Sequence, residues 1–233
     1  MKKAIWYFVF TPIILGSIFG NLLGIKWMDY LFKPFIMVWI ALFFVYQGRN
    51  IDLQLKNMIL FAFAFSWAGD VLLMFSGRDF IWFILGLVSF LLAQVFYVLS
   101  FIRSVIINQS KGFILSHPVW LIPFIAYGII IFSVLYDHLD PVLRLAVLVY
   151  MIAIITMSCM AFNRKNAVGD RSFRLVFIGS LLFIVSDTLL AVNKFVVPVP
   201  LERLFVLGSY ISAQYLIMRG VISQFIPEKA EEK

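Results

Sequence analysis

The sequence predicts an all-α membrane protein, a polytopic bundle of eight transmembrane helices with both termini in the cytoplasm. Composition is the first observation behind this prediction. Of the 233 residues, 63% are hydrophobic and only 13% are charged, whereas a soluble domain has about 45–50% apolar and about 25% charged residues. The mean hydropathy of +1.01 agrees. One water-facing globule cannot bury that much apolar surface, so we predict an integral membrane protein.

The spacing of charged residues is the second observation. A spanning helix needs about 20 mainly apolar residues, and charged residues bound eight windows of suitable composition. These windows are 4–25, 34–48, 57–77, 80–102, 112–136, 145–163, 175–193 and 204–218.

Three of these windows need a further interpretation. The apolar run of the first is longer than the ~7–15-residue core of a signal peptide, so we interpret it as a retained helix. The second window is expected to begin at Lys33-Pro34, because proline is well tolerated in a first helical turn. The eighth is expected to continue past Arg219.

The distribution of basic residues is the third observation. With the N-terminus inside, the inner segments hold 13 lysines and arginines and the outer segments hold 6, which the positive-inside rule favours. We expect one transmembrane domain, 1–226, and a short polar tail, 227–233. The net charge of +7 fits contact with membrane lipids rather than nucleic acid. We expect a multi-pass protein of a bacterial cytoplasmic (inner) membrane, and a homodimer is compatible with the sequence.

Two aspartates inside predicted spans are the main candidates for chemistry. Asp70 lies about two-thirds along the third span and Asp187 about two-thirds along the seventh. An ionisable group in hydrocarbon is costly and is a functional-site hypothesis by default. Both spans run outward, so the two carboxyls are expected at a similar depth in the outer half of the membrane. We predict that Asp70 and Asp187 are catalytic residues.

The surroundings of the two aspartates match. Gly69-Asp70-Val71-Leu72-Leu73 resembles Ser186-Asp187-Thr188-Leu189-Leu190, and an Ala-Gln pair ending at Gln94 or Gln214 follows in the next span. The pattern indicates two parallel four-helix repeats related by an axis along the membrane normal. Such a repeat would bring the two aspartates together.

Other polar residues in or near the spans are candidates for substrate binding. For each taken singly, interhelical hydrogen bonding or an interfacial anchor is the alternative explanation. The candidates are Lys33, Ser66, Gln94, Tyr97, Tyr150, Ser186, Asn193, Lys194, Tyr210 and Gln214.

Two classes of intramembrane hydrolase fit poorly. A zinc enzyme needs a histidine cluster, but the two histidines, His117 and His138, lie near span ends. An aspartyl protease would carry a Gly-x-Gly-Asp signature, whereas Trp67 occupies the first glycine position before Asp70. We therefore expect no metal site.

The chain resembles the YhhN family of eight-helix membrane proteins, which includes the lysoplasmalogenases. The resemblance covers nearly the whole chain, and one departure is Gln94, where many members have a histidine. The segments that carry it are Lys33-Pro34, 65–73, 86–90 with Tyr97, Tyr150-Met151, 179–187, Leu190-Ala191, Lys194-Phe195 and 210–214.

The resemblance implies hydrolysis of the vinyl ether of a lysoplasmalogen to a fatty aldehyde and a glycerophospho-headgroup, with a lysophospholipid as substrate and no cofactor. This reaction needs a proton donor and a group that activates water. Glycosidases solve a related oxocarbenium problem with two carboxyls, and burial beside a second carboxyl favours a protonated acid. One aspartate would be the general acid and the other the base, while Lys33 or Lys194 would meet the lipid phosphate. The alternative is a lipid or small-molecule transporter in which the aspartates carry coupling protons.

Overall fold

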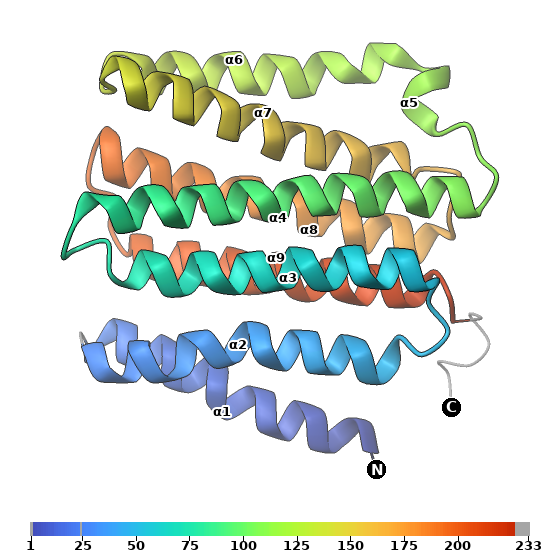
Figure 1. Cartoon of the computed structure of the whole chain (residues 1–233), viewed down its shortest axis with the longest axis horizontal. Coiled ribbons are helices and arrows are strands. Elements are labelled where there is room, and N and C mark those ends of the chain that lie inside the picture. Colours follow the sequence, from blue (N-terminus) through green and yellow to red (C-terminus); the bar gives the residue numbers. More distant parts are fainter. Residues whose placement is uncertain (1, 24, 227–233) are drawn as a thin grey trace.

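The computed structural model describes residues 2–23 and 25–226, and all regular secondary structure in this part of the chain is helical (Figure 1). The polar tail predicted at 227–233 lies outside the described residues. The helices are α1 Lys2–Leu22, α2 Lys26–Gln47, α3 Leu53–Met74, α4 Phe80–Ile107, α5 Phe113–Ser116, the 3-10 helix η1 Pro118–Leu121, α6 Ile122–Tyr136, α7 Pro141–Asn163, α8 Asp170–Phe195 and α9 Glu202–Ser223.

Seven of the predicted spans are long and apolar enough to cross a membrane in the described part of the chain. They correspond to α2, α3, α4, η1 with α6, α7, α8 and α9. The first predicted span is α1, whose apolar stretch is shorter and covers Phe8–Gly20. The prediction of an all-α, polytopic membrane bundle is therefore confirmed.

Two predicted helix boundaries were wrong. The second helix begins at Lys26, so Pro34 lies inside α2 and not in its first turn. Charged residues bounded the predicted window, but near a membrane surface they do not end a helix. In the fifth window, α5 is separate from the spanning helix that starts at Pro118. A proline disfavours helical geometry in the residue before it. His117, which precedes Pro118, accordingly has φ −139° and ψ 68°.

The spanning helices form two similar halves (Figure 1). The antiparallel pair α3–α4 packs beside the antiparallel pair α8–α9 at the centre of the bundle. Helix α2, with α1 outside it, contacts α3 and α9, while α7, with α6 outside it, contacts α8 and α4. This arrangement follows the pseudo-twofold relation that the matching aspartate segments indicate.

Glycines allow the closest helix contacts. A Cβ atom on Gly179 of α8 would lie 2.9 Å from the backbone oxygen of Ala213 in α9. A Cβ on Gly220 of α9 would lie 2.9 Å from the backbone nitrogen of Val176. Small residues let transmembrane helices approach without a side chain between their backbones. The close packing of α8 against α9 therefore requires glycine, which has no Cβ atom, at these two positions.

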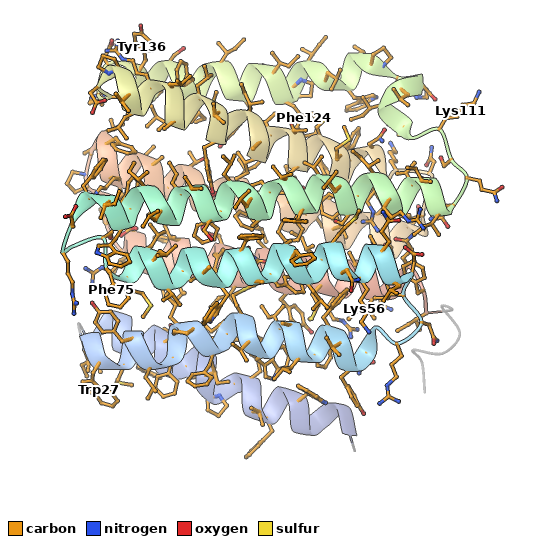
Figure 2. All side chains as sticks on the ribbon, viewed as in Figure 1. Trp27, Lys56, Phe75, Lys111, Phe124 and Tyr136 are labelled. Carbon is orange, nitrogen blue, oxygen red and sulfur yellow. The ribbon has the colours of Figure 1, made fainter. Side chains whose placement is uncertain are left out.

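The two ends of the bundle differ in character. Figure 2 shows Lys56 and Lys111 at one end and Trp27, Phe75 and Tyr136 at the other. The start of α1 and the end of α9 lie at the lysine end. Interfacial aromatic residues and basic cytoplasmic loops are typical of membrane proteins. This polarity agrees with an inward-facing lysine end, and we call the aromatic end the outer end.

A buried arginine joins three helices at the inner end. Arg164 follows α7 and is fully buried. Its guanidinium donates to Ser104 Oγ of α4 at 2.9 Å, to Ser172 Oγ of α8 at 2.8 Å, and to Oε1 of Gln224, after α9, at 3.1 Å. Burial lowers the pKa of Arg164 to about 9, so it keeps its charge at neutral pH. The hydrogen bonds to neutral oxygens compensate for its desolvation.

An ion pair links the start of α3 to α4 near the same end. Arg103 donates to both carboxylate oxygens of Asp52, at 3.1 and 3.2 Å. Asp52 also caps α3 by accepting from the backbone N–H of Leu55. The Arg103 guanidinium and this cap hold the pKa of Asp52 below its ordinary value. Both side chains remain partly exposed, so we expect the pair to add little stability.

Candidate active site

A ladder of hydrogen bonds connects α3 and α9 in the interior. Ser66 and Asp70 lie four residues apart on α3, so they share a helix face. Tyr210 and Gln214 lie four residues apart on the antiparallel α9. Tyr210 Oη donates to Asp70 Oδ2 at 2.7 Å, and Gln214 Nε2 donates to Ser66 Oγ at 3.0 Å. The helical spacing on each side therefore sets the register of the two helices.

Tyr97 of α4 completes this ladder. Its hydroxyl donates to Gln214 Oε1, so both ends of the Gln214 amide are used. Tyr97, Ser66 and Gln214 are completely buried. Four predicted site residues are thus brought together with Asp70: Ser66, Tyr97, Tyr210 and Gln214.

Lys33 of α2 gives Asp70 a counter-charge. Its Nζ lies 3.6 Å from Asp70 Oδ1, and its side chain is 24% exposed, against 4% for Asp70. Lys33 is therefore partly exposed while its ammonium group reaches a nearly buried carboxyl. Lys33, predicted from sequence to bind substrate and with an interfacial anchor as the alternative, thus contacts one of the two interior aspartates.

Asp187 of α8 has a different partner. The Tyr150 hydroxyl of α7 donates to Asp187 Oδ2. Among the described residues, no lysine or arginine forms an ion pair with Asp187. The Asp187 carboxyl nevertheless lies within electrostatic range of Asp70. The prediction that the two aspartates lie in one region of the bundle agrees with this geometry.

Aromatic rings fill the space next to the carboxyls. The ring of Phe90 meets those of Phe183 and Tyr210 edge-on, at centroid distances of 6.4 and 5.9 Å, and Phe183 meets Tyr210 at 5.6 Å. Phe183 precedes Asp187 by one helical turn. A Cβ on Gly69 would lie 2.6 Å from the Phe90 ring, so the glycine before Asp70 makes room for it. Ring faces present negative potential that favours a nearby cation.

Gln94 is buried without a hydrogen bond. It is 0% exposed, and neither its amide nitrogen nor its amide oxygen has a hydrogen-bond partner in the described part of the chain. It lies close enough to the Tyr150 hydroxyl to interact with it. Buried polar groups are normally paired, so Gln94 is an exception inside the site.

The remaining predicted residues make structural contacts near the outer end. Ser186 Oγ donates to the Val206 carbonyl at 3.1 Å, which links α8 to α9. Asn193 Oδ1 accepts from Val199 N at 2.9 Å in the α8–α9 connection. Lys194 lies 5.1 Å from the centroid of the Phe83 ring. These contacts do not involve the two aspartates.

Sequence reasoning missed several neighbours of the site. Phe90 and Phe183 were not singled out, because an apolar residue in an apolar helix carries no separate signal. Tyr127 of α6 bonds to Thr188 Oγ1 at 2.6 Å, beside Asp187. A tyrosine within the fifth span was a signal that could have found it. Among the described residues, no group of three or more His, Cys, Asp or Glu side chains could hold a metal ion.

The fold and the paired carboxyls define a multi-pass helical membrane protein with an acidic site inside its bundle. The model of the YhhN family matches residues 28–221, and the chain belongs to that family. The resemblance predicted from sequence is confirmed.

Curated relatives cover most of the chain. It is 30% identical over 198 residues to "Lysoplasmalogenase TMEM86B" of Sus scrofa, covering 84% of this chain and 76% of the relative. It is 26% identical over 207 residues to "Lysoplasmalogenase TMEM86A" of Homo sapiens, covering 87% and 81%. No solved structure gives a significant match.

Proposed function

We propose that the protein is a lysoplasmalogenase that hydrolyses the vinyl ether of a lysoplasmalogen. The observation that carries this proposal is the pair of interior aspartates with unlike partners, Lys33 on Asp70 and Tyr150 on Asp187. The names of the curated relatives support the same activity. The products are a fatty aldehyde and glycerophosphoethanolamine or glycerophosphocholine.

The unlike partners divide the work between the carboxyls. The Lys33 ammonium stabilises the carboxylate form of Asp70, so Asp70 is the base. Asp187 has a neutral phenol as partner and a second carboxyl oxygen that makes no hydrogen bond among the described residues, so Asp187 is the acid. Two carboxyls in different surroundings commonly divide acid and base roles in this way.

The reaction begins with protonation of carbon. Asp187 gives its proton to the β-carbon of the vinyl ether, and the electron pair of the double bond forms the new C–H bond. The positive charge develops on the α-carbon and the ether oxygen, where the rings of Phe90, Phe183 and Tyr210 stabilise it.

Water then completes the hydrolysis. Asp70 accepts a proton from a water whose oxygen bonds to the α-carbon, which gives a hemiacetal. The hemiacetal hydroxyl returns its proton to Asp187, the bond to the glycerol oxygen breaks, and Asp70 protonates the leaving alcohol. One water is consumed, and both carboxyls return to their starting forms.

Direct detection of aldehyde tests the proposal. Detergent-purified protein is incubated with a lysoplasmalogen, and free fatty aldehyde is measured by mass spectrometry. The wild type should release aldehyde, and Asp70→Asn or Asp187→Asn should lower turnover by about 10²–10⁴-fold, the range for general acid–base groups. Asp137→Asn is the matched control, because Asp137 is exposed at the end of α6.

Two results would contradict the proposal. Near-normal turnover in either buried-aspartate variant would remove that residue from the mechanism. Transfer of intact lysolipid across liposomes by wild-type protein, with no aldehyde formed, would instead support a proton-coupled transporter.

A further inference from the structure

A groove of about 310 Å³ lies between α4 and α7 on the side of the bundle away from Lys33. Helix α4 contributes Leu87 and Val88, and α7 contributes Ala146 and Val149. Val88 and Val149 are 47% and 44% exposed, so the groove is open along its side to the surrounding lipid. Among the described residues, the only polar one that lines it is Tyr150.

Tyr150 connects this groove to the candidate active site. Tyr150 lines the groove, and its hydroxyl donates to Asp187. Tyr150 of α7 and Asp187 of α8 lie at a similar depth, because each is about nine residues from the outer end of its helix. A molecule in the groove therefore reaches the reacting carboxyl through the Tyr150 position.

Gln94 marks the inner end of this path. It follows the groove-lining Leu91 by three residues on α4, so it lies about one turn deeper. Its amide is completely buried and makes no hydrogen bond of good geometry among the described residues, although it lies near the Tyr150 hydroxyl. Gln214, its counterpart in the second half, uses both of its amide atoms. Because the buried amide lacks partners in one half of the bundle and has them in the other, it indicates a ligand atom in the half that contains Gln94.

The lining restricts what the groove can bind. A peptide would need hydrogen bonds for each backbone group in a low-dielectric setting, and the walls offer only one hydroxyl. A hydrocarbon chain needs none. The open side also means that the groove must hold only the part of the chain next to the reacting group, while the rest stays in the bilayer.

We infer that the α4–α7 groove binds the single hydrocarbon chain of a lysolipid and admits it sideways from the membrane. The chain then passes Tyr150, and the Gln94 amide oxygen accepts a hydrogen bond from the free hydroxyl of the glycerol at its head. This inference rests on the proposed function for the identity of that lipid, and it adds where the chain lies. Chain binding and turnover are separate measurements.

A photoreactive, non-hydrolysable lipid tests the groove without turnover. The probe is a saturated 1-O-alkyl lysophosphatidylethanolamine with a diazirine in the chain, which lacks the double bond that must be protonated. After irradiation in detergent micelles, labelled residues are mapped by peptide mass spectrometry. Labels should concentrate on α4 and α7 at the groove, and unlabelled alkyl lysolipid should compete for them.

Substitutions then test the site itself. Ala146→Trp fills the groove and should lower competed labelling by about tenfold or more, a loss of about 1.4 kcal/mol in binding. Ile152→Trp is the matched control, because Ile152 lies on the same helix, is 55% exposed and does not line the groove. Gln94→Leu removes the amide and should weaken probe binding by about tenfold.

The outcomes separate this inference from the proposed hydrolysis. Labels spread evenly over lipid-facing residues, or equal labelling of Ala146→Trp and Ile152→Trp, would overturn the groove. Unchanged binding by Gln94→Leu would overturn the role of its amide. If labels concentrate in the groove but wild-type protein forms no aldehyde from lysoplasmalogen, the groove stands and the hydrolysis fails. If aldehyde forms while labels map elsewhere, the hydrolysis stands and the groove fails.

Discussion

Lys33 and Tyr150 stand in the same relation to the two interior aspartates. Each lies 37 residues before the aspartate that it contacts, Lys33 on α2 before Asp70 on α3 and Tyr150 on α7 before Asp187 on α8. The two halves of the bundle therefore place a side chain at the same position against each carboxyl. One half supplies a cation and the other a neutral phenol, so a symmetric scaffold creates two unlike acids.

Tyr150→Phe should lower kcat with little change in KM. The substitution keeps the ring and removes the hydroxyl that donates to Asp187. A hydrogen bond to a charged or reacting group contributes about 1.5–3 kcal/mol, which corresponds to about 10–100-fold in kcat. Aldehyde release at several substrate concentrations measures both constants. Tyr136→Phe, at the outer end of α6, is the control, and a rise in KM alone would count against a role in positioning Asp187.

Lys33→Gln should destabilise the protein, and adding Asp70→Asn should restore much of that loss. Removing the lysine leaves a mostly buried carboxylate without its counter-charge, which costs several kcal/mol when burial is complete and less here, because Lys33 is partly exposed. A double-mutant cycle on the free energy of unfolding should give a coupling of about 1 kcal/mol or more. Lys194→Gln serves as the control, and additive effects would contradict the pairing.

Arg164→Ala should lower the free energy of unfolding by about 1–3 kcal/mol, because it removes the guanidinium donors to the buried hydroxyl oxygens of Ser104 and Ser172 and one of the two donors to Gln224 Oε1. Thermal unfolding in detergent measures the change. Arg103→Ala removes a partly exposed ion pair and should shift the midpoint much less. Equal shifts in the two variants would show that the buried network is not the main support at the inner end.

Gly179→Ala and Gly208→Ala should change stability in opposite directions. At Gly179 the new methyl group would lie 2.9 Å from a backbone oxygen of α9, so the helices must separate, at about 1–3 kcal/mol. At Gly208 nothing lies within 4 Å, and alanine should add about 0.5–1 kcal/mol through its higher helix propensity. The midpoint of thermal unfolding measures both variants, and a stabilised Gly179→Ala would contradict the close packing of α8 and α9.

The sequence by itself determined the class of fold and its two central residues. Apolar windows of membrane-spanning length define the helices, because a bilayer leaves few other ways to satisfy the backbone. Asp70 and Asp187 stood out because a carboxyl in hydrocarbon costs free energy, so its presence there indicates a function. A spacing of four residues in a helix also places Ser66 on the same face as Asp70, and Tyr210 on the same face as Gln214.

Only the tertiary structure decided which side chains meet. Lys33 could be placed at a membrane surface from sequence, but its pairing with Asp70 depends on how α2 packs against α3. Gln94 and Gln214 are alike in their local sequence, yet only Gln214 finds hydrogen-bond partners in the described structure. Hydropathy fixes how far each helix spans and says nothing of its rotation or neighbours, which side-chain packing between helices sets.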